Sequence, residues 1–233
     1  EKIIAETLLK ELKPVKTICK KTGKYSGVYR TPKLKIIAGE KTKQTVHKEN
    51  GILLNLDVEK VYFSTRSGNE RLRISKQVKK GEEILVMFSG CAPFPCVIAK
   101  NSLPKSIIGI EINPIAHKYA IENLKLNKLT NIGLIKGDVR KVLQKINKKF
   151  DRILMPLPKN AETYLDEALT RSKKGTIIHL YQFLNEKDFG KSKKIIEKAC
   201  NKAKKKFKIL DLVKCGHFGP GIYRVCIDFK IIS

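Results

Sequence analysis

The sequence predicts an α/β protein in which a doubly wound, mainly parallel sheet follows a small, mainly β module. Three observations lead to this prediction. From Glu83 onwards, short apolar runs alternate with helical patterns, which is typical of parallel strands connected by helices. These runs are nearly continuous in apolar residues, as expected for strands that are buried on both faces. Upstream of Glu83 the strand candidates are instead short and rich in lysine.

The first 64 residues are expected to form the small module. Apolar residues at helical spacing predict a helix over residues 1–14, which Pro14 ends. The Asn50-Gly51 pair signals a hairpin turn. Short strands are predicted at Lys33–Ile37, Thr45–Lys48, Ile52–Asp57 and Lys60–Phe63. We place a second domain, residues 65–233, after the last of these strands.

The second domain is expected to contain the main sheet. Its clearest helix is Asn113–Asn127, with Pro114 at the first helical position. A basic helix is expected over Glu186–Lys206, followed by two final strands. Because only Gly216–Gly221 joins these strands, we expect them to form an antiparallel pair at one edge of the sheet. The predicted strands are Glu83–Phe88, Ile107–Glu111, Ile132–Lys136, Arg152–Met155, Thr176–Tyr181, Phe207–Val213 and Tyr223–Ile232.

The charge of the chain indicates a polyanionic partner. Lys and Arg number 49 against 22 Asp and Glu, which gives a formal net charge of +27. Nucleic acid is the usual partner for such an excess, although a lysine-rich composition can also reflect a high growth temperature. We see neither an amphipathic helix of the membrane-binding kind nor a run of about 18 apolar residues that could span a membrane.

The six cysteines do not have the spacing of a metal site. They include no C-x-x-C pair, and no histidine lies at ligand spacing from them. The sequence shows no secretory signal either. We therefore expect reduced thiols, no metal and a cytoplasmic location.

Residues suited to a nucleoside follow three consecutive strands of the predicted sheet. Gly90 lies in the turn after the first strand, where a glycine lets the backbone approach a ligand. The second strand ends in Glu111, whose two carboxylate oxygens suit a ribose diol. The third strand ends near Asp138, which suits an adenine amine but also a helix N-cap. Because parallel strands end at one edge of a sheet, the combination predicts a nucleoside-containing cofactor.

The fourth strand ends in Met155-Pro156-Leu157-Pro158. Two prolines fix the backbone of a turn at the strand end. Such a turn can hold a flat substrate base against the cofactor, or it can simply terminate the strand.

In this order the motifs resemble the class I S-adenosylmethionine-dependent methyltransferases, which have a Rossmann-like sheet. They resemble most closely the archaeal tRNA guanine-N1 methyltransferases that act at position 37, beside the anticodon. Many relatives carry a further N-terminal domain, which this chain is not expected to hold. The resemblance runs from about Tyr29 to the C-terminus and is carried by Tyr29–Leu34, His47–Gly51, Val61–Ser64, Asn69–Arg73, Met87–Gly90, Glu111–Pro114, Met155–Pro158 and Tyr223–Arg224.

The resemblance implies roles for individual residues. Glu70 matches the general base that removes the N1 proton of guanine, and Arg30 matches the arginine that stabilises charge on guanine O6. Pro156 and Pro158 match the turn that holds the substrate base. The residues expected to contact S-adenosyl-L-methionine are Tyr62, Arg71, Phe88, Gly90, Glu111, Ile112, Asn113, Asp138 and Val139.

The chain also departs from the family pattern at three places. Pro156 stands where many relatives have asparagine, and Ala92 stands where they usually have a second glycine. His217–Pro220 replaces a more usual Tyr-Ala-Pro. His47, His117 and His179 form no nucleophile–His–Asp arrangement and are expected to be structural.

The implied activity is methyl transfer from S-adenosylmethionine to N1 of guanosine 37 in tRNA, by a monomer whose first domain contacts the tRNA. Guanine N1 must lose its proton before it attacks, and a carboxylate in hydrogen-bond reach can accept that proton. A guanidinium is the matching donor for the charge that develops on O6. Three alternatives remain open: methylation of a wyosine-type base, aminocarboxypropyl transfer to that base, and a non-catalytic RNA-binding protein on the same scaffold.

Overall fold

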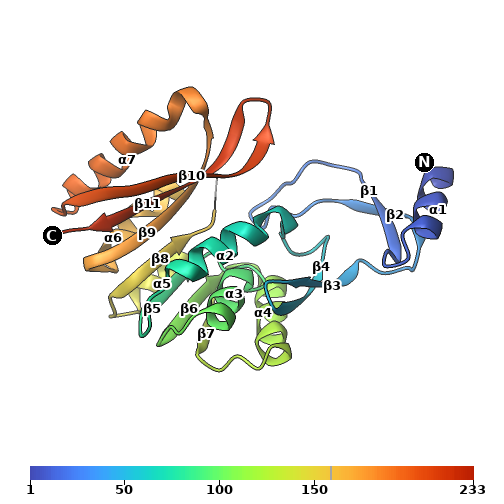
Figure 1. The fold of residues 1–233 in the computed structure, drawn as a ribbon, viewed down its shortest axis with the longest axis horizontal. Helices are drawn as coiled ribbons and strands as arrows, with labels where there is room; N and C mark the ends of the chain where they lie inside the picture. The colour runs from blue at the N-terminus through green and yellow to red at the C-terminus, as the bar shows by residue number, and fades with distance from the viewer. Residues whose placement is uncertain (158) are drawn as a thin grey trace.

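A seven-stranded mixed sheet forms the centre of the protein (Figure 1). The structure is a computed structural model and describes residues 1–157 and 159–233. Five strands of the sheet run parallel, and two form the antiparallel pair that the sequence predicts at one edge. The parallel strands are β5 (Glu83–Met87), β6 (Ser106–Glu111), β7 (Ile132–Lys136), β8 (Phe150–Met155) and β9 (Ser172–Asn185); the antiparallel pair is β10 (Phe207–Gly219) and β11 (Ile222–Ile231).

The order of the strands places a ligand-binding edge at β5. The order is β10-β11-β9-β8-β5-β6-β7, so the chain runs outward from β5 in one direction through β6 and in the other through β8. In open α/β sheets, ligands bind beyond the carboxyl ends of the strands at such a reversal. The ends of β5, β6 and β8 are therefore the expected place for a site.

Helices cover both faces of this sheet. Successive residues of β5 point to opposite faces, so Leu85 and Met87 join one apolar cluster while Ile84 and Val86 join another. The first cluster includes side chains of α5 (Val139–Gln144), α6 (Leu165–Thr170) and α7 (Phe189–Lys202). The second includes side chains of α2 (Gly68–Gln77) and α3 (Pro93–Asn101), and α4 (Pro114–Leu126) contacts β6 and β7. The predicted doubly wound fold is confirmed.

The N-terminal segment extends away from the main sheet (Figure 1). It consists of α1 (Lys2–Glu11), β1 (Thr17–Lys21) and β2 (Leu34–Gly39), with β1 and β2 paired antiparallel. None of the described helices, including α1, is long and apolar enough to cross a membrane.

A separate hairpin follows, formed by β3 (Gln44–Glu49) and β4 (Ile52–Asp57). Asn50 and Gly51 both have positive φ, as the predicted tight hairpin turn requires. The hairpin packs on α3 and α4 through an apolar cluster that includes Leu54, Leu56 and Val97.

The expected strand at Lys60–Phe63 is wrong. The backbone N–H groups of Lys60 and Val61 both donate to the carbonyl of Asp57, and the carboxylate of Asp57 accepts from the N–H groups of Glu59 and Lys60. These contacts close a turn, and they consume the donors that a strand would present to a neighbour. The segment therefore leads directly into η1 (Thr65–Ser67) and α2.

Two asparagines, Asn123 in α4 and Asn127 at its C-terminal cap, hold the edge of the hairpin. The Asn123 side chain accepts from the Asn55 N–H at 2.7 Å and donates to the carbonyls of Asn55 and Cys91 at 3.1 and 3.0 Å. Asn127, one helical turn later, makes the equivalent pair of contacts with Leu53. The two amides thus pair with β4 as a neighbouring strand would, and they fix the hairpin against the main sheet.

We expect Asn123→Ala to destabilise the protein by about 1–3 kcal/mol, because buried backbone groups lose their hydrogen-bond partners. Urea unfolding near neutral pH measures this free energy. Lys125→Ala, at an exposed position of the same helix, is the matched control and should change stability by less than about 0.5 kcal/mol. Equal effects of the two substitutions would contradict this account of the hairpin.

Candidate active site

The turn after β5 has an unusual backbone. Phe88, Gly90 and Ala92 all have φ values near +60°, at 61°, 58° and 66°. This left-handed region strains residues that carry a Cβ atom, so surrounding contacts must hold the turn. Glu111 at the end of β6 supplies one of them, because its Oε2 accepts from the Gly90 N–H at 2.7 Å. Its Oε1 accepts from the Asn113 N–H, also at 2.7 Å.

A cavity of about 170 Å³ lies at this turn, and we call it the Glu111 cavity. It brings together eight of the nine residues that were expected to contact the cofactor, together with Arg30 and Pro156. The expected residues that line it are Tyr62, Phe88, Gly90, Glu111, Ile112, Asn113, Asp138 and Val139.

Two carboxylates of the Glu111 cavity differ in environment. Burial raises the pKa of Glu111, while hydrogen bonds from the backbone N–H groups of Asn113, Gly90 and Ile112 oppose that rise. Asp138 caps α5, with its Oδ1 accepting from the Arg140 N–H at 2.8 Å. The capping role considered from the sequence is therefore real, and the same residue also lines the cavity.

Arg30 enters the Glu111 cavity from the N-terminal segment. Its φ is 51°, and its guanidinium donates to the carbonyl of Lys159 at 2.6 Å. Burial lowers the pKa of Arg30, although Tyr62 and Tyr164 work in the opposite direction. Tyr164 also packs edge-on against Phe88, with ring centroids 4.8 Å apart.

A second cavity of about 80 Å³ contains Glu70, and we call it the Glu70 cavity. It shares Tyr62, Phe88, Gly90 and Pro156 with the Glu111 cavity, so the two adjoin at the ends of β5 and β8. A hydrogen bond from the Leu157 N–H to the Met155 carbonyl closes a tight turn around Pro156. Pro158, the other residue expected to hold the substrate base, lies outside the described residues.

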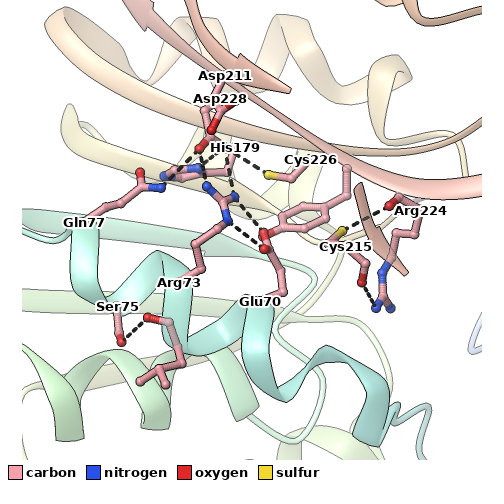
Figure 2. Close-up of polar contacts among 12 residues, drawn as sticks. Glu70, Arg73, Ser75, Gln77, His179, Asp211, Cys215, Arg224, Cys226 and Asp228 are labelled. Atoms are coloured by element: carbon pink, nitrogen blue, oxygen red, sulfur yellow. Dashed lines mark hydrogen bonds and ion pairs between the residues drawn. The ribbon is translucent and has the colours of Figure 1, made fainter. Parts of the chain in front are cut away.

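The Glu70 carboxylate is buried and held by two side chains (Figure 2). Arg73, one helical turn later, donates to Oε2 at 2.7 Å and to Oε1 at 2.8 Å. The Tyr181 hydroxyl on β9 donates to Oε1 at 2.7 Å. A carboxylate oxygen can accept about two hydrogen bonds. Oε2, with one donor, therefore keeps the capacity to accept another.

Arg73 connects Glu70 to a carboxylate on β11. It donates to Asp228 at 2.7 Å, so one guanidinium bridges two buried carboxylates (Figure 2). Burial alone would lower the pKa of Arg73, but Glu70 and Asp228 outweigh it and raise that pKa. Burial would likewise raise the pKa of Asp228, but His179 and Arg73 outweigh it and hold that pKa below its usual range.

His179 continues this network in its neutral form. Its Nε2 lies 2.7 Å from Nη1 of Arg152, and its Nδ1 lies 2.6 Å from Asp228. A guanidinium has no acceptor, so Nε2 must accept and the proton must sit on Nδ1, where it is donated to Asp228. Burial lowers the pKa of His179 although Asp228 opposes this, which agrees with a neutral ring.

His179, Cys226 and Asp228 also place metal-ligand atoms within 4.8 Å of one another. Each of these atoms already has a hydrogen-bond partner, and the Cys226 thiol donates to Asp228 at 3.1 Å. Two guanidinium groups touch the cluster as well. A cation there would face their charge, so we interpret the cluster as structural.

Arg71 lies apart from the other expected cofactor contacts. It is buried, and its Nε and Nη2 groups donate to the two carboxylate oxygens of Glu49 on β3. It lines the Glu70 cavity but not the Glu111 cavity.

Sequence reasoning missed the side chains that hold Glu70. Tyr181 and His179 stand two residues apart in an apolar strand, and Asp228 stands in another. Polar side chains at every second residue of a strand lie on the same face of that strand. This signal indicates a buried polar face, but it does not reveal which helix covers that face.

Comparisons with known proteins agree with this geometry. The family model of the TRM5/TYW2 methyltransferase domain matches residues 45–210, and that of the TYW2 N-terminal domain matches residues 1–42. The chain is 40% identical over 231 residues to the tRNA (guanine(37)-N(1))-methyltransferase Trm5b of Pyrococcus abyssi, covering 99% of this chain and 68% of the relative. The crystal structure of Trm5b from Pyrococcus abyssi superposes with a TM-score of 0.90, at 39% identity, covering 100% of this chain and 69% of that one.

Two other solved structures show what relatives bind. The complex of aTrm5 with tRNALeu matches with a TM-score of 0.88 and 36% identity, covering 100% of this chain and 66% of that one. The Methanocaldococcus jannaschii TYW2 structure, in complex with AdoMet, matches with a TM-score of 0.75 and 32% identity, covering 85% and 91%.

The fold and the site define a class I methyltransferase, a class whose cofactor is S-adenosylmethionine. The chain belongs to the TRM5/TYW2 methyltransferase family. It spans 68% and 62% of the length of two Trm5b relatives, from Pyrococcus abyssi and Methanocaldococcus jannaschii.

We expect Asp228→Asn to destabilise the protein by about 2–4 kcal/mol near neutral pH, because it leaves the half-buried Arg73 and the buried His179 short of a charged partner. The lowered pKa of Asp228 contributes stability that is present above the unfolded-state value of about 3.9 and is lost as the pH falls further. The difference between parent and variant should therefore shrink on acidification. Urea unfolding over a pH series measures both effects.

Asp211→Asn is the matched control. Asp211 pairs with Asp228 across the two strands but is exposed. Its substitution should change stability by less than about 0.5 kcal/mol at any pH tested. A difference between Asp228→Asn and the parent that stays constant with pH would show that the lowered pKa contributes nothing.

Proposed function

We propose that this protein is a tRNA methyltransferase that transfers a methyl group from S-adenosylmethionine to N1 of guanosine at position 37. The observation that carries the proposal is the meeting of two cavities. One has carboxylates suited to a nucleoside, the other has the buried carboxylate of Glu70, and they share Tyr62, Phe88, Gly90 and Pro156. The name of the Pyrococcus abyssi relative, a tRNA (guanine(37)-N(1))-methyltransferase, supports it.

The chemistry of the Glu111 cavity fits the cofactor. Glu111 would accept hydrogen bonds from the ribose hydroxyls, and Asp138 would accept one from the adenine amine. In the adjoining Glu70 cavity, the buried Ser89 hydroxyl has no hydrogen-bond partner among the described residues, which leaves it for a polar group of a bound ligand. Bound S-adenosylmethionine supplies a methyl group that is already activated on a sulfonium centre.

Residues of this chain would then accept the N1 proton of guanine and stabilise the negative charge that develops on its O6 atom. Glu70 accepts the N1 proton, and Oε2 is the oxygen with capacity for it. Arg73 and Tyr181 keep that carboxylate in place. The Arg30 guanidinium stabilises the charge that develops on O6. The Pro156 turn at the shared wall holds the base, and proximity does the remaining work.

The wider interactions follow from charge and from the relatives. A formal net charge of +27 suits an RNA partner, and a relative has been solved with tRNALeu. In this proposal, residues 1–64 contact the tRNA and residues 65–233 carry out catalysis. The protein acts as a cytoplasmic monomer and needs no metal, because the methyl group is already activated.

A second candidate is modification of a wyosine-type base at the same position. The match of residues 1–42 to the TYW2 N-terminal domain favours it. A Methanocaldococcus jannaschii relative named as a 4-demethylwyosine aminocarboxypropyltransferase is 34% identical over 218 residues, covering 92% of this chain and 86% of the relative. Offering the enzyme tRNA with guanosine and tRNA with 4-demethylwyosine at this position separates the two candidates by product mass.

We expect the parent protein to form 1-methylguanosine in an unmodified tRNA transcript, and Glu70→Gln to slow this step by about 10²–10⁴-fold in single turnover. Glutamine keeps the shape of Glu70 and can bind Tyr181, but it cannot accept the proton. Nucleoside mass spectrometry identifies the product, and rapid quench under single-turnover conditions gives the rate of the chemical step.

Glu197→Gln, an exposed glutamate on α7, is the matched control and should transfer methyl at the parent rate. A transcript with adenosine at position 37 should remain unmethylated. The activity itself would be refuted by a parent protein that leaves the guanosine transcript unchanged. A parent-like rate for Glu70→Gln would refute only the proton-accepting role.

We expect Glu111→Ala to weaken binding of S-adenosylmethionine by about 1–3 kcal/mol, because the ribose hydroxyls and the Gly90 N–H both lose their acceptor. Isothermal titration calorimetry measures the affinity. Glu122→Ala on α4, which does not line the Glu111 cavity, is the control. Unchanged affinity in Glu111→Ala would remove Glu111 from the cofactor site.

A further inference from the structure

A third cavity, of about 670 Å³, opens beside the Glu70 cavity, and we call it the outer cleft. Its walls come from the N-terminal segment, from the chain between β4 and α2, and from β9, β10 and β11. It shares Tyr62, Phe63, Ser64 and Arg224 with the Glu70 cavity. The two therefore adjoin, and a base in the Glu70 cavity has the outer cleft as a neighbouring space for the nucleotide chain attached to it.

The outer cleft presents an aromatic surface. Phe218, near the tip of the β10–β11 hairpin, is 64% exposed. Its ring lies 4.1 Å from that of Phe183 at an interplanar angle of 31°, so the two are nearly stacked. Phe183 supports one side of Phe218 and leaves much of the exposed ring available. Aromatic rings displayed in this way are the usual platform for unpaired bases.

The charges of the outer cleft match a phosphate backbone. Its charged side chains are Lys21, Arg66 and Arg224, and none of the described residues that line it is acidic. Arg224 donates to the Cys215 carbonyl at 2.9 Å, which holds the guanidinium at the wall common to both cavities. Gly216 makes room for it, because a Cβ atom there would lie 3.0 Å from the Arg224 guanidinium.

We propose that the outer cleft binds the unpaired nucleotide next to the modified guanosine. Its base stacks on Phe218, and Arg224 contacts the phosphate that links the two nucleotides. The proposal rests on the proposed function, since it takes an RNA base to be the occupant of the Glu70 cavity. It gives a role to His217–Pro220, one of the three places at which this chain departs from the family pattern.

The test is Phe218→Ala, compared with Phe218→Trp, on an unmodified tRNA transcript. Loss of one base stack should weaken tRNA binding by about five- to 100-fold in Phe218→Ala. Phe218→Trp keeps an aromatic ring at this position and should bind tRNA as tightly as the parent. Filter binding gives the affinity. Calorimetry with S-adenosylmethionine should give the parent value in both variants. Because Phe218 is exposed, neither substitution should affect folding, and thermal unfolding checks this.

A second arm identifies the stacked base. The affinities of the parent and of Phe218→Ala are measured for two transcripts, one with an abasic site on the 5′ side of the guanosine and one with an abasic site on the 3′ side. For the side that stacks on Phe218, the abasic site removes the difference between the two proteins, as expected when both changes break one contact. If neither abasic transcript removes the difference, the proposal is wrong.

Leu103→Ala, at a similarly exposed apolar residue outside the outer cleft, is the matched control and should bind tRNA as the parent does. Parent-like tRNA affinity in Phe218→Ala, in a protein that forms 1-methylguanosine, would overturn this inference alone. A change in sedimentation, with tRNA affinity unchanged, would assign the cleft to a second copy of the chain and overturn it too. Absence of product in the parent would instead refute the proposed function.

Discussion

The arrangement of the site depends on two contacts that hold α2 on the sheet: the ion pair of Arg73 with Asp228 on β11 and the hydrogen bond of Tyr181 on β9 to Glu70. Burying a charge is costly unless it is paired, and Arg73 meets this requirement by bridging Glu70 and Asp228. Any shift of the helix along the sheet would leave a buried carboxylate without its partner. The pairing therefore fixes the register of α2, and with it the wall of the Glu70 cavity. An apolar contact could hold the helix equally well, but it would not place a carboxylate in that cavity.

The Glu111 cavity is built in a different way. Glu111 joins the end of β6 to the strained turn after β5, so the carboxylate proposed to bind the ribose also holds the backbone around it. Asp138 likewise caps α5 while it lines the cavity. Consecutive strands and their turns supply most of this site, and sequence patterns describe such local units well. This is why eight of the nine expected cofactor residues lie together.

The parts that could not be predicted depend on contacts between distant segments. Tyr181 and Glu70 are 111 residues apart, and Arg73 and Asp228 are 155 apart. Only the pairing of β9 with β11 and the docking of α2 bring them together. Arg71 was expected to contact the cofactor, and its guanidinium makes a contact that the sequence did not predict. It faces Glu49 of the hairpin instead.

This difference in construction separates the proposed binding of the cofactor, which the relatives share, from the recognition and modification of the base, which differ among them. The proposed cofactor side is formed mainly by strand ends of one sheet, whereas the proposed base side combines α2 and the β10–β11 hairpin; the N-terminal segment contributes to both. Segments joined only by tertiary contacts can change without disturbing the strand ends. The relatives include enzymes named for methyl transfer and for aminocarboxypropyl transfer, at 40% and 34% identity. Selectivity for the base is therefore expected to reside in the residues around Glu70 and in the outer cleft.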